Sequence, residues 1–359
     1  MKIMNEAIAK IKGANNKTMA KEEERIDNLS KPIGSLGEME SIVIRLKGIF
    51  GEEPINIAKR TVVIMCADNG VVEAGVSSNP QEVTQIVTRN FEKGITGVNA
   101  LARYYHSDLT VVDIGINGEI QSDFILNRKI RLGTDNMIKG PAMTREEALK
   151  AIEIGIEVVT ALKKSGYQML GTGEMGVGNT ATSAAVFSVL SGLTLEEVAG
   201  KGAGLTEKQF KQKKAVLEEA IRVNKPDKND VIDVISKVGG FDIAGLCGCF
   251  IGAAANNMPI VIDGLIASVA AYCALLIEAK TKDYMFASHL SNEAGAKHVM
   301  KALDLNPMLT LNMRLGEGSG CPLAFGVMDA AVYTLTSMGT FEEAALNRND
   351  YVDMKKENN

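Results

Sequence analysis

The chain has 359 residues, of which 46% are hydrophobic and 23% charged, so it can bury a large core as one big domain or as one domain with a small appendage. The net charge is −5 and no long basic run occurs, so the sequence lacks the positive patch of proteins that bind nucleic acids or anionic membranes. Tryptophan is absent and aromatic residues are few, whereas glycine occurs 35 times, which favours tightly packed α/β units over a β-sandwich.

The N-terminus carries charges throughout and lacks the apolar core of a signal peptide. The longest apolar stretch, residues 259–277, is interrupted by Asp263 and Gly264, which indicates a strand, a turn and a helix instead of a membrane span. We therefore expect a cytoplasmic protein.

The first 60 residues have a strongly charged, helical pattern, and the SLGE of residues 35–38 resembles a capping box that opens a helix through about residue 47. From residue 61 onward, short continuous apolar runs are each followed by a polar or glycine-containing turn and usually by a helical pattern. These runs are residues 61–66, 109–114, 168–170, 259–262 and 284–287. Apolar strands that alternate with helices predict an α/β fold with a doubly wound, mostly parallel sheet covered by helices on both faces.

Three later segments predict helices. The TEKQ of residues 206–209 is a second capping box, residues 241–255 are rich in Gly and Ala as a helix packed closely on a sheet requires, and residues 322–338 form a final apolar helix.

The cysteines and histidines do not predict a metal site. The five cysteines have no paired spacing, and the single residue between Cys247 and Cys249 is unlike the spacing of zinc knuckles. We expect these cysteines to be buried, reduced thiols. The three histidines are scattered along the chain, so the sequence predicts neither a metal nor a cofactor.

Ligands of open parallel sheets bind outside the carboxyl ends of the strands. Asp68, Asn69, Glu174, Asp263 and residues 289–292 all follow or end predicted strands, so we expect them along one edge. Asp263 either binds ribose hydroxyls or caps the helix that starts there. The same two interpretations apply to Ser291, with capping favoured.

The glycine-rich run of residues 171–180, GTGEMGVGNT, contains one acid, Glu174, and opens a helix over residues 180–190. Glycines that let backbone N–H groups approach an anion, followed by a helix N-terminus, form a phosphate-binding loop. Tight structural packing explains the same pattern equally well. The run lacks the lysine of a Walker loop.

A second glycine-rich run, residues 311–322 (LNMRLGEGSGCP), surrounds another acid, Glu317. A carboxylate flanked by glycines and bounded by apolar segments is a candidate general base. The alternative is that Glu317 merely caps the helix that begins near Pro322. Two such loops in one chain favour an active site.

Together with KPIGSLGEME, ADNGVVEAGVSSNPQEVT and GGFDIAGLCG, these runs resemble nicotinate-nucleotide:dimethylbenzimidazole phosphoribosyltransferases over roughly residues 25–335. The resemblance implies a large α/β domain, a small helical domain built from both chain ends, and a homodimer. We place the small domain at residues 1–60 with about 335–359 and the large domain at residues 61–334.

The resemblance also implies roles for individual residues. The nucleotide phosphate and ribose would be bound by Gly176, Gly178, Asn179, Thr180, Lys213, Asp263 and Ser291, and the acceptor base by Ser77, Gln85 and Leu315. From the residues alone, Lys213 is one solvated charge among several lysines, and residues 75–83 are a surface turn.

The implied reaction transfers the 5-phosphoribosyl group from nicotinate mononucleotide to 5,6-dimethylbenzimidazole in cobalamin lower-ligand synthesis. Glu317 would act as general base and Glu174 as second carboxylate. The leaving group is a pyridinium cation, which needs neither protonation nor a metal. A different azole, purine or phenolic acceptor, a nucleotide N-glycosidase and a non-catalytic nucleotide-binding module remain alternatives.

Overall fold

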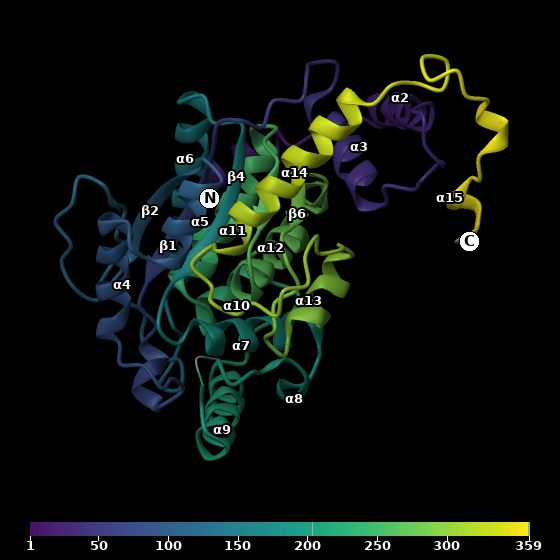
Figure 1. The fold of residues 1–359 in the computed structure, drawn as a ribbon. Coiled ribbons are helices and arrows are strands. Elements are labelled where there is room, and N and C mark those ends of the chain that lie inside the picture. The colour runs from purple at the N-terminus through teal and green to yellow at the C-terminus, as the bar shows by residue number, and fades with distance from the viewer. Residues whose placement is uncertain (203, 358–359) are drawn as a thin grey trace.

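Six parallel strands form one sheet at the centre of the molecule, in the order β3-β2-β1-β4-β5-β6 (Figure 1). The structure is a computed structural model and describes residues 1–202 and 204–357. The strands are β1 (Arg60–Ala67), β2 (Asp108–Gly115), β3 (Leu126–Asn127), β4 (Met169–Met175), β5 (Ile260–Ile262) and β6 (Met285–Ala287).

Helices surround this sheet. The α-helices are α1 (Lys2–Ile8), α2 (Asn16–Asp27), α3 (Glu38–Phe50), α4 (Glu82–Lys93), α5 (Gly97–Tyr104), α6 (Arg145–Lys164), α7 (Asn179–Ser191), α8 (Leu195–Val198), α9 (Glu207–Asn224), α10 (Val231–Val238), α11 (Phe241–Ala255), α12 (Leu265–Ile277), α13 (Ala296–Leu303), α14 (Gly320–Ser337) and α15 (Met354–Glu357). Short 3-10 helices are η1 (Gly70–Ala74), η2 (Ala279–Tyr284) and η3 (Arg348–Asp350). No helix of the described residues is both long and apolar enough to cross a membrane.

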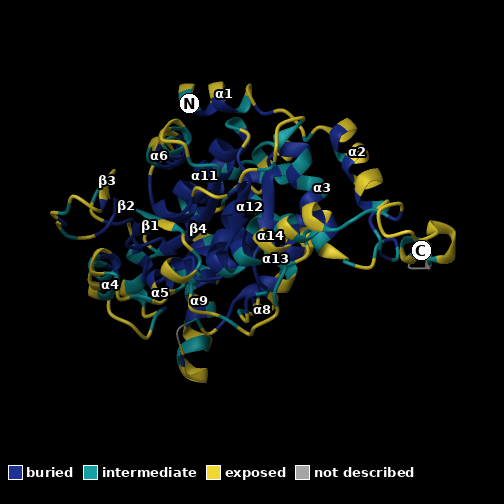
Figure 2. Cartoon of the chain, turned by 45° about the horizontal axis from the view of Figure 1, so that its top comes forward, coloured by how far each residue is buried: buried dark blue, intermediate teal, exposed yellow. Residues whose placement is uncertain are grey.

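The sheet is covered on both faces, as the sequence predicted. Val62 and Met65 point to opposite faces of β1 because side chains alternate along a strand. Val62 contacts the segment that leads into α14, whereas Met65 contacts α11, on which α6 packs. Figure 2 shows the strands and α11 as the buried centre, with exposed residues on the outer helices.

Four of the predicted strands are observed within one residue of their expected ends, but β4 is longer than predicted. The apolar run of residues 168–170 is only its beginning, and the strand continues through Gly171 and Gly173 to Met175. A Cβ atom on Gly171 would lie 2.6 Å from Cβ of Cys321, so this glycine allows α14 to lie directly on the strand. The two-residue strand β3 was not predicted.

The predicted helix starts are partly confirmed. Thr206 and Gln209 form the expected capping box of α9, and α11 has the predicted limits. The capping box at residues 35–38 was wrong, because α3 begins after Gly37 and has no side-chain cap. Instead, the carboxylate of Glu40 accepts a hydrogen bond from the backbone N–H of Leu36 and pairs with Lys31.

The two ends of the chain meet on one side of the molecule, where Figure 1 shows the purple α2 and α3 beside the yellow C-terminal segment. Leu29 pairs with Thr340 and Ile33 with Asp353 in isolated β-bridges, and α3 packs on α14. Helix α1 instead packs on α6 and α11. The division into residues 1–60 with 335–359 and residues 61–334 stays a prediction.

The strand order places a switch point between β1 and β4, because the chain continues on one side from β1 and on the other from β4. Crevices at such points, outside the carboxyl ends of the strands, bind ligands. Asp68 and Asn69 follow β1, and Glu174 lies near the end of β4. The fold therefore directs attention to this edge.

Candidate active site

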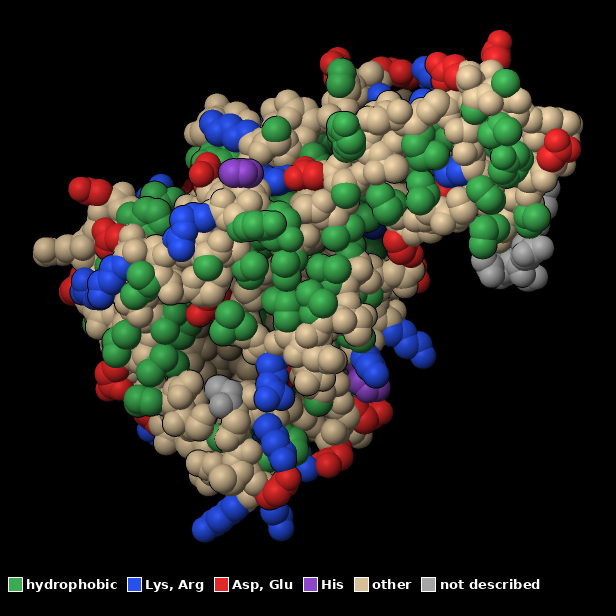
Figure 3. Space-filling model, in the orientation of Figure 1, with side chains coloured by type: hydrophobic (Ala, Val, Ile, Leu, Met, Phe, Trp, Pro, Cys, Tyr) green, Lys and Arg blue, Asp and Glu red, His purple; other side chains and the backbone are tan. Residues whose placement is uncertain are grey.

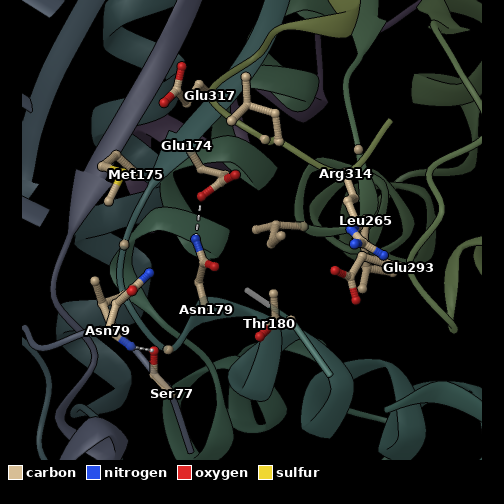
Figure 4. Close-up of a pocket in the computed structure, with 18 of the residues that line it drawn as sticks. Ser77, Asn79, Glu174, Met175, Asn179, Thr180, Leu265, Glu293, Arg314 and Glu317 are labelled. Atoms are coloured by element: carbon tan, nitrogen blue, oxygen red, sulfur yellow. Dashed lines mark hydrogen bonds between the residues drawn. The ribbon is translucent and has the colours of Figure 1, made fainter. Parts of the chain in front are cut away.

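A cavity of about 350 Å³ opens at the carboxyl ends of the strands. Its walls come from the segments that follow β1, β4, β5 and β6 and from the segment before α14 (Figure 4). Ten of the predicted site residues line it: Ser77, Glu174, Gly176, Gly178, Asn179, Thr180, Asp263, Ser291, Leu315 and Glu317. The structure thus brings together residues from five separate segments.

Glu317 is held in an unusual backbone conformation at the rim of this cavity. Its φ of 62° is left-handed, which is costly for a residue with a side chain and is typical of functional sites. The carboxylate faces the N-terminus of α5, where it accepts a hydrogen bond of 3.4 Å from the backbone N–H of Val98. Partial burial raises the pKa of Glu317. Hydrogen bonds from the backbone N–H groups of Val98 and Gly97 lower it, but by less.

Glu317 does not cap the helix that follows it. Helix α14 begins at Gly320 without a side-chain cap. Its first turn is held by Asp263, whose carboxylate accepts hydrogen bonds from the N–H groups of Gly318 (3.1 Å) and Gly320 (2.7 Å). Asp263 therefore fixes the loop that carries Glu317. Of the two interpretations of Asp263, the one in which it caps the helix that follows is not observed, because α12 has no side-chain cap.

Burial also affects the acidity of Asp263, which is only 2% exposed. It raises the pKa of this carboxyl to about 7, although the N–H groups of Gly320 and Gly318 stabilise the ionised form.

Glu174 faces the cavity from the end of β4, and the loop of Glu317 passes close over it. A Cβ atom on Gly316 would lie 2.6 Å from Oε1 of Glu174, so this loop can approach the carboxylate only because residue 316 is glycine. The other carboxylate oxygen, Oε2, accepts a short hydrogen bond from Nδ2 of Asn179. Burial and, second, the nearby charge of Asp242 raise the pKa of Glu174 to about 8.

The glycines after β4 serve the packing of the protein. A Cβ atom on Gly176 would collide with the backbone oxygen of Ala67, and one on Gly178, which has a φ of +91°, would lie 2.7 Å from Val72 Cγ2. Moreover, the N–H of Val177 already donates to Oγ1 of Thr84 (3.0 Å).

Lys213 lies behind Thr180 and is completely buried, so its interpretation as a solvated charge was wrong. Its Nζ donates to Oγ1 of Thr180 and to the backbone oxygen of Gly200, each over 3.0 Å. Burial lowers its pKa to about 8, and the charge of Glu293 opposes this shift. Among the described residues, no carboxylate forms an ion pair with Lys213. It therefore provides a buried positive charge at this end of the cavity.

Of the two polar residues predicted to contact the acceptor base, only one lines the cavity. Ser77 lines the cavity, and its Oγ accepts a hydrogen bond from the N–H of Asn79 (3.1 Å). Gln85 does not line it, because its side-chain amide donates to the backbone oxygen of Glu119 (2.9 Å). Val83 and Val87, on another face of the same helix, form the apolar wall.

Ser291 lines the opposite side of the cavity, where its Oγ accepts a hydrogen bond from the N–H of Glu293 (3.4 Å). It does not cap α13, which begins after Gly295 without a side-chain cap.

The sequence did not single out three further residues of the site. Arg314 and Lys201 line the cavity and bring positive charge to it. Asp242 lies behind Asn179 and is fully buried. An aspartate in the first turn of a helix is common, so only its position against another helix distinguishes Asp242.

The five cysteines are free and buried, as expected. Within residues 1–202 and 204–357, no group of three or more His, Cys, Asp or Glu side chains is arranged to hold a metal ion.

Comparison with known proteins assigns the family. A family model described as phosphoribosyltransferase matches residues 11–346. The chain belongs to this family. This phosphoribosyltransferase is 55% identical over 336 residues to the nicotinate-nucleotide–dimethylbenzimidazole phosphoribosyltransferase of Clostridium acetobutylicum, an alignment that covers 94% of this chain and 96% of that protein. The enzyme of the same name from Ruminiclostridium cellulolyticum is 55% identical over 343 residues, with 96% and 97% covered.

Solved structures agree with this assignment. The crystal structure of CobT from Thermus thermophilus matches the phosphoribosyltransferase with a TM-score of 0.88 at 35% identity, covering 92% of this chain and 99% of that chain. The family resemblance inferred from the sequence motifs is thereby confirmed, as is the α/β fold.

Proposed function

We propose that this phosphoribosyltransferase moves the 5-phosphoribosyl group from nicotinate mononucleotide to 5,6-dimethylbenzimidazole, which gives α-ribazole 5′-phosphate and nicotinate. The relatives at 55% identity carry the corresponding name. The proposal is supported by Glu174 and Glu317, which line one cavity, and by the buried lysine Lys213, which lies behind Thr180 of the cavity wall. The donor carries a negatively charged phosphate and a positively charged ring. A site for it therefore needs both a positive charge and carboxylates.

The donor suits the charges of the cavity. Its pyridinium nitrogen is positive before the glycosidic bond breaks and neutral afterwards, so positive charge shifts onto the ribose as the ring leaves. Glu174 provides a carboxylate at the cavity wall that stabilises this charge. The leaving ring needs no proton, because the electron pair of the broken bond neutralises its nitrogen.

The phosphate of the donor would lie against the first turn of α7. Thr180 provides a hydroxyl there, Lys213 supplies the positive charge behind it, and the helix N-terminus favours an anion. The side chain of Asn179 is turned toward Glu174 (Figure 4), so we expect it to lie beside the ribose and not beside the phosphate.

The acceptor base would lie between Glu317 and the apolar wall of Val83, Val87 and Leu315, with Ser77 at its edge. Glu317 takes the proton from one ring nitrogen while the other nitrogen bonds to the anomeric carbon, and nicotinate leaves from the opposite side. The configuration at this carbon is therefore inverted. The raised pKa of Glu317 suits a proton acceptor near neutral pH.

We further propose that two copies of the chain pair through an apolar surface beside the cavity. Figure 3 shows hydrophobic side chains gathered over the region of α14. Leu311, Tyr104 and Tyr333 are 52%, 75% and 74% exposed there, and Tyr105, Leu323 and Val327 line an apolar groove with Leu311. Large apolar surfaces of this kind favour protein contact.

We place the enzyme in the cytoplasm, which its free cysteines support.

The function is tested by incubation of the protein with nicotinate mononucleotide and one base at a time (5,6-dimethylbenzimidazole, benzimidazole, adenine or phenol), followed by mass spectrometry. We expect the phosphoribosylated base and an equal amount of nicotinate, also in excess chelator. A parallel reaction with nicotinate riboside should be slow, because the phosphate contact is lost. Release of nicotinate and ribose 5-phosphate at the same rate without any base would instead identify a nucleotide N-glycosidase.

A further inference from the structure

Asp242 is a fully buried carboxylate in the first turn of α11. It lies behind Asn179 of α7, which lines the cavity. Its Oδ1 accepts a hydrogen bond of 2.9 Å from the N–H of Ile243 in its own helix. Its Oδ2 faces another helix, α7, and accepts a hydrogen bond of 3.2 Å from Nδ2 of Asn179. Asp242 thus links the start of α11 to the start of α7.

The same amide nitrogen of Asn179 also serves Glu174. An NH₂ group has two hydrogens, and here one is directed to Asp242 and the other to Oε2 of Glu174. With a carboxylate on each hydrogen, the amide cannot rotate by half a turn without bringing its own oxygen against an acceptor. Figure 4 shows the amide nitrogen toward Glu174 and the amide oxygen on the side of Leu265.

The surrounding backbone is shaped to accommodate this contact. A Cβ atom on Gly176 would lie 2.9 Å from Oδ2 of Asp242 and 3.1 Å from the amide nitrogen of Asn69. A Cβ atom on Gly240 would collide with the carboxylate of Asp242 and with the amide oxygen of Asn69. Side chains would displace the network at both positions, so the ends of β1 and β4 and the starts of α7 and α11 converge on it.

We propose that Asp242 is a positioning residue for phosphoribosyl transfer: it fixes the Asn179 amide, which in turn orients Glu174 and presents its own oxygen toward the ribose. This inference rests on the proposed role of Glu174. The competing explanation is that Asp242 only stabilises the N-terminus of α11, as acids in a first helical turn commonly do.

The contacts around Glu174 allow a first test of whether Asp242 and Asn179 act on this carboxylate. The groups that face its carboxylate are Asp242 from α11, Asp263 after β5, Asn179 from α7 and the backbone N–H of Glu317. After burial, the charge of Asp242 is the main cause that raises the pKa of Glu174 to about 8, and the Asn179 amide lowers it. Asp242 accepts hydrogen bonds from the N–H of Ile243 and from Nδ2 of Asn179, and these favour its ionised form against burial, which raises its pKa.

Two substitutions should therefore shift the pKa of Glu174 in opposite directions. Asp242→Asn removes a negative charge next to the carboxylate, which favours its ionised form and lowers its pKa. Asn179→Leu removes a donor to the ionised form, which raises the pKa. Loss of the charge alone lowers the pKa of Glu174 whatever the role of Asp242, so the kinetics of a folded Asp242→Asn variant separate the two explanations: a residue that only stabilises a helix end predicts an unchanged kcat/KM.

The experiment is a carboxyl NMR titration of protein labelled with ¹³C at the glutamate side chains, with the Glu174 signal identified by its absence in Glu174→Gln. We expect a downward shift of at least about 0.5 pH units in Asp242→Asn and an upward shift of similar size in Asn179→Leu. The matched control is Asp233→Asn, an acid in the first turn of α10, which should leave the signal unchanged.

Steady-state kinetics complete the test. In Asp242→Asn, kcat/KM for nicotinate mononucleotide should fall by about 10-fold or more, with its acidic limb moved to lower pH in step with the NMR titration. An unchanged Glu174 titration in both variants would overturn the proposal. If Asp242→Asn does not fold, an absent upward shift in Asn179→Leu overturns it. Opposed NMR shifts with an unchanged kcat/KM in folded Asp242→Asn would also overturn the proposal, whereas wild-type turnover in Glu174→Gln would overturn the proposed role of Glu174.

Discussion

Glu317 is the residue on which turnover should depend most. Glutamine at this position keeps the shape of the side chain and removes the base, so we expect kcat to fall about 100-fold or more, within the range that general-base catalysis contributes. Affinity for nicotinate mononucleotide should change little, because the phosphate contacts lie at the other end of the cavity. Steady-state kinetics and calorimetric binding measure the two effects. Glu342→Gln, at an exposed glutamate, is the control, and wild-type turnover in Glu317→Gln would refute the assignment.

Glu174 should lose a proton when the donor binds. With a pKa of about 8 it is largely protonated at pH 7, and the pyridinium cation of the donor favours its ionised form. Binding of nicotinate mononucleotide should therefore release a fraction of a proton near pH 7. Calorimetry in buffers of different ionisation enthalpy measures this release, which Glu174→Gln should largely remove. Net proton uptake by the wild-type protein would contradict the prediction.

The buried charge of Lys213 should lower the free energy of unfolding and, at the same time, strengthen nucleotide binding. Its pKa of about 8 lies below that of an unfolded lysine, so between about pH 8 and 10.4 the unfolded state binds more protons and stability rises with pH. Below pH 8 the full cost of the buried charge is present. Lys213→Met should thus raise the free energy of unfolding by about 1–3 kcal/mol at pH 7 and weaken nucleotide binding.

Urea denaturation at pH 7 and pH 10 tests this pH dependence, because the gain in stability from Lys213→Met should narrow at pH 10. Lys208→Met, at an exposed lysine of the same helix, should show neither the gain in stability nor the loss of binding. A less stable Lys213→Met protein at pH 7 would contradict the prediction.

Among the elements, the loop between α13 and α14 depends on a residue that follows β5. Asp263→Ala leaves the buried N–H groups of Gly318 and Gly320 without their acceptor, which costs about 1–3 kcal/mol for each group. The loop then no longer holds Glu317 in place, so kcat should fall about as much as in Glu317→Gln. Because Asp263 acts by holding Glu317 in place, the losses of kcat in Asp263→Ala and Glu317→Gln should not add.

A double-mutant cycle measures this coupling. We expect Asp263→Ala with Glu317→Gln to have a kcat close to that of Glu317→Gln alone, while thermal unfolding reports the loss of stability separately. Fully multiplicative losses in kcat would show that Asp263 acts independently of Glu317.

The whole molecule should be a dimer in solution through the surface near α14. Leu311→Asp places a charge in the apolar groove formed with Tyr105 and Val327, so it should shift the protein toward monomers. Light scattering after size-exclusion chromatography gives the mass. Leu276→Asp, at another exposed leucine, is the control. A wild-type monomer at micromolar concentration would refute the proposed pairing.

The fold class and most elements could be predicted from local patterns in the sequence. Alternating apolar runs and helical patterns identified the sheet, and local signals placed the start of α9 and both ends of α11, because hydrophobic periodicity and capping act between neighbours in the chain. The glycine-rich segments also pointed to Glu174 and Glu317. Local signals failed where distant packing intervened, as in β4, whose glycines lie under α14.

How these residues are held depends on contacts between distant parts of the chain. Asp263 and Gly318 are 55 positions apart, Asn179 and Asp242 63 apart, and Lys213 and Thr180 33 apart. No spacing pattern predicts such contacts, because they arise when the sheet order brings strand ends and helix starts to one edge. The same packing buries Lys213 and Asp242, and burial, not residue type, raises or lowers their pKa values.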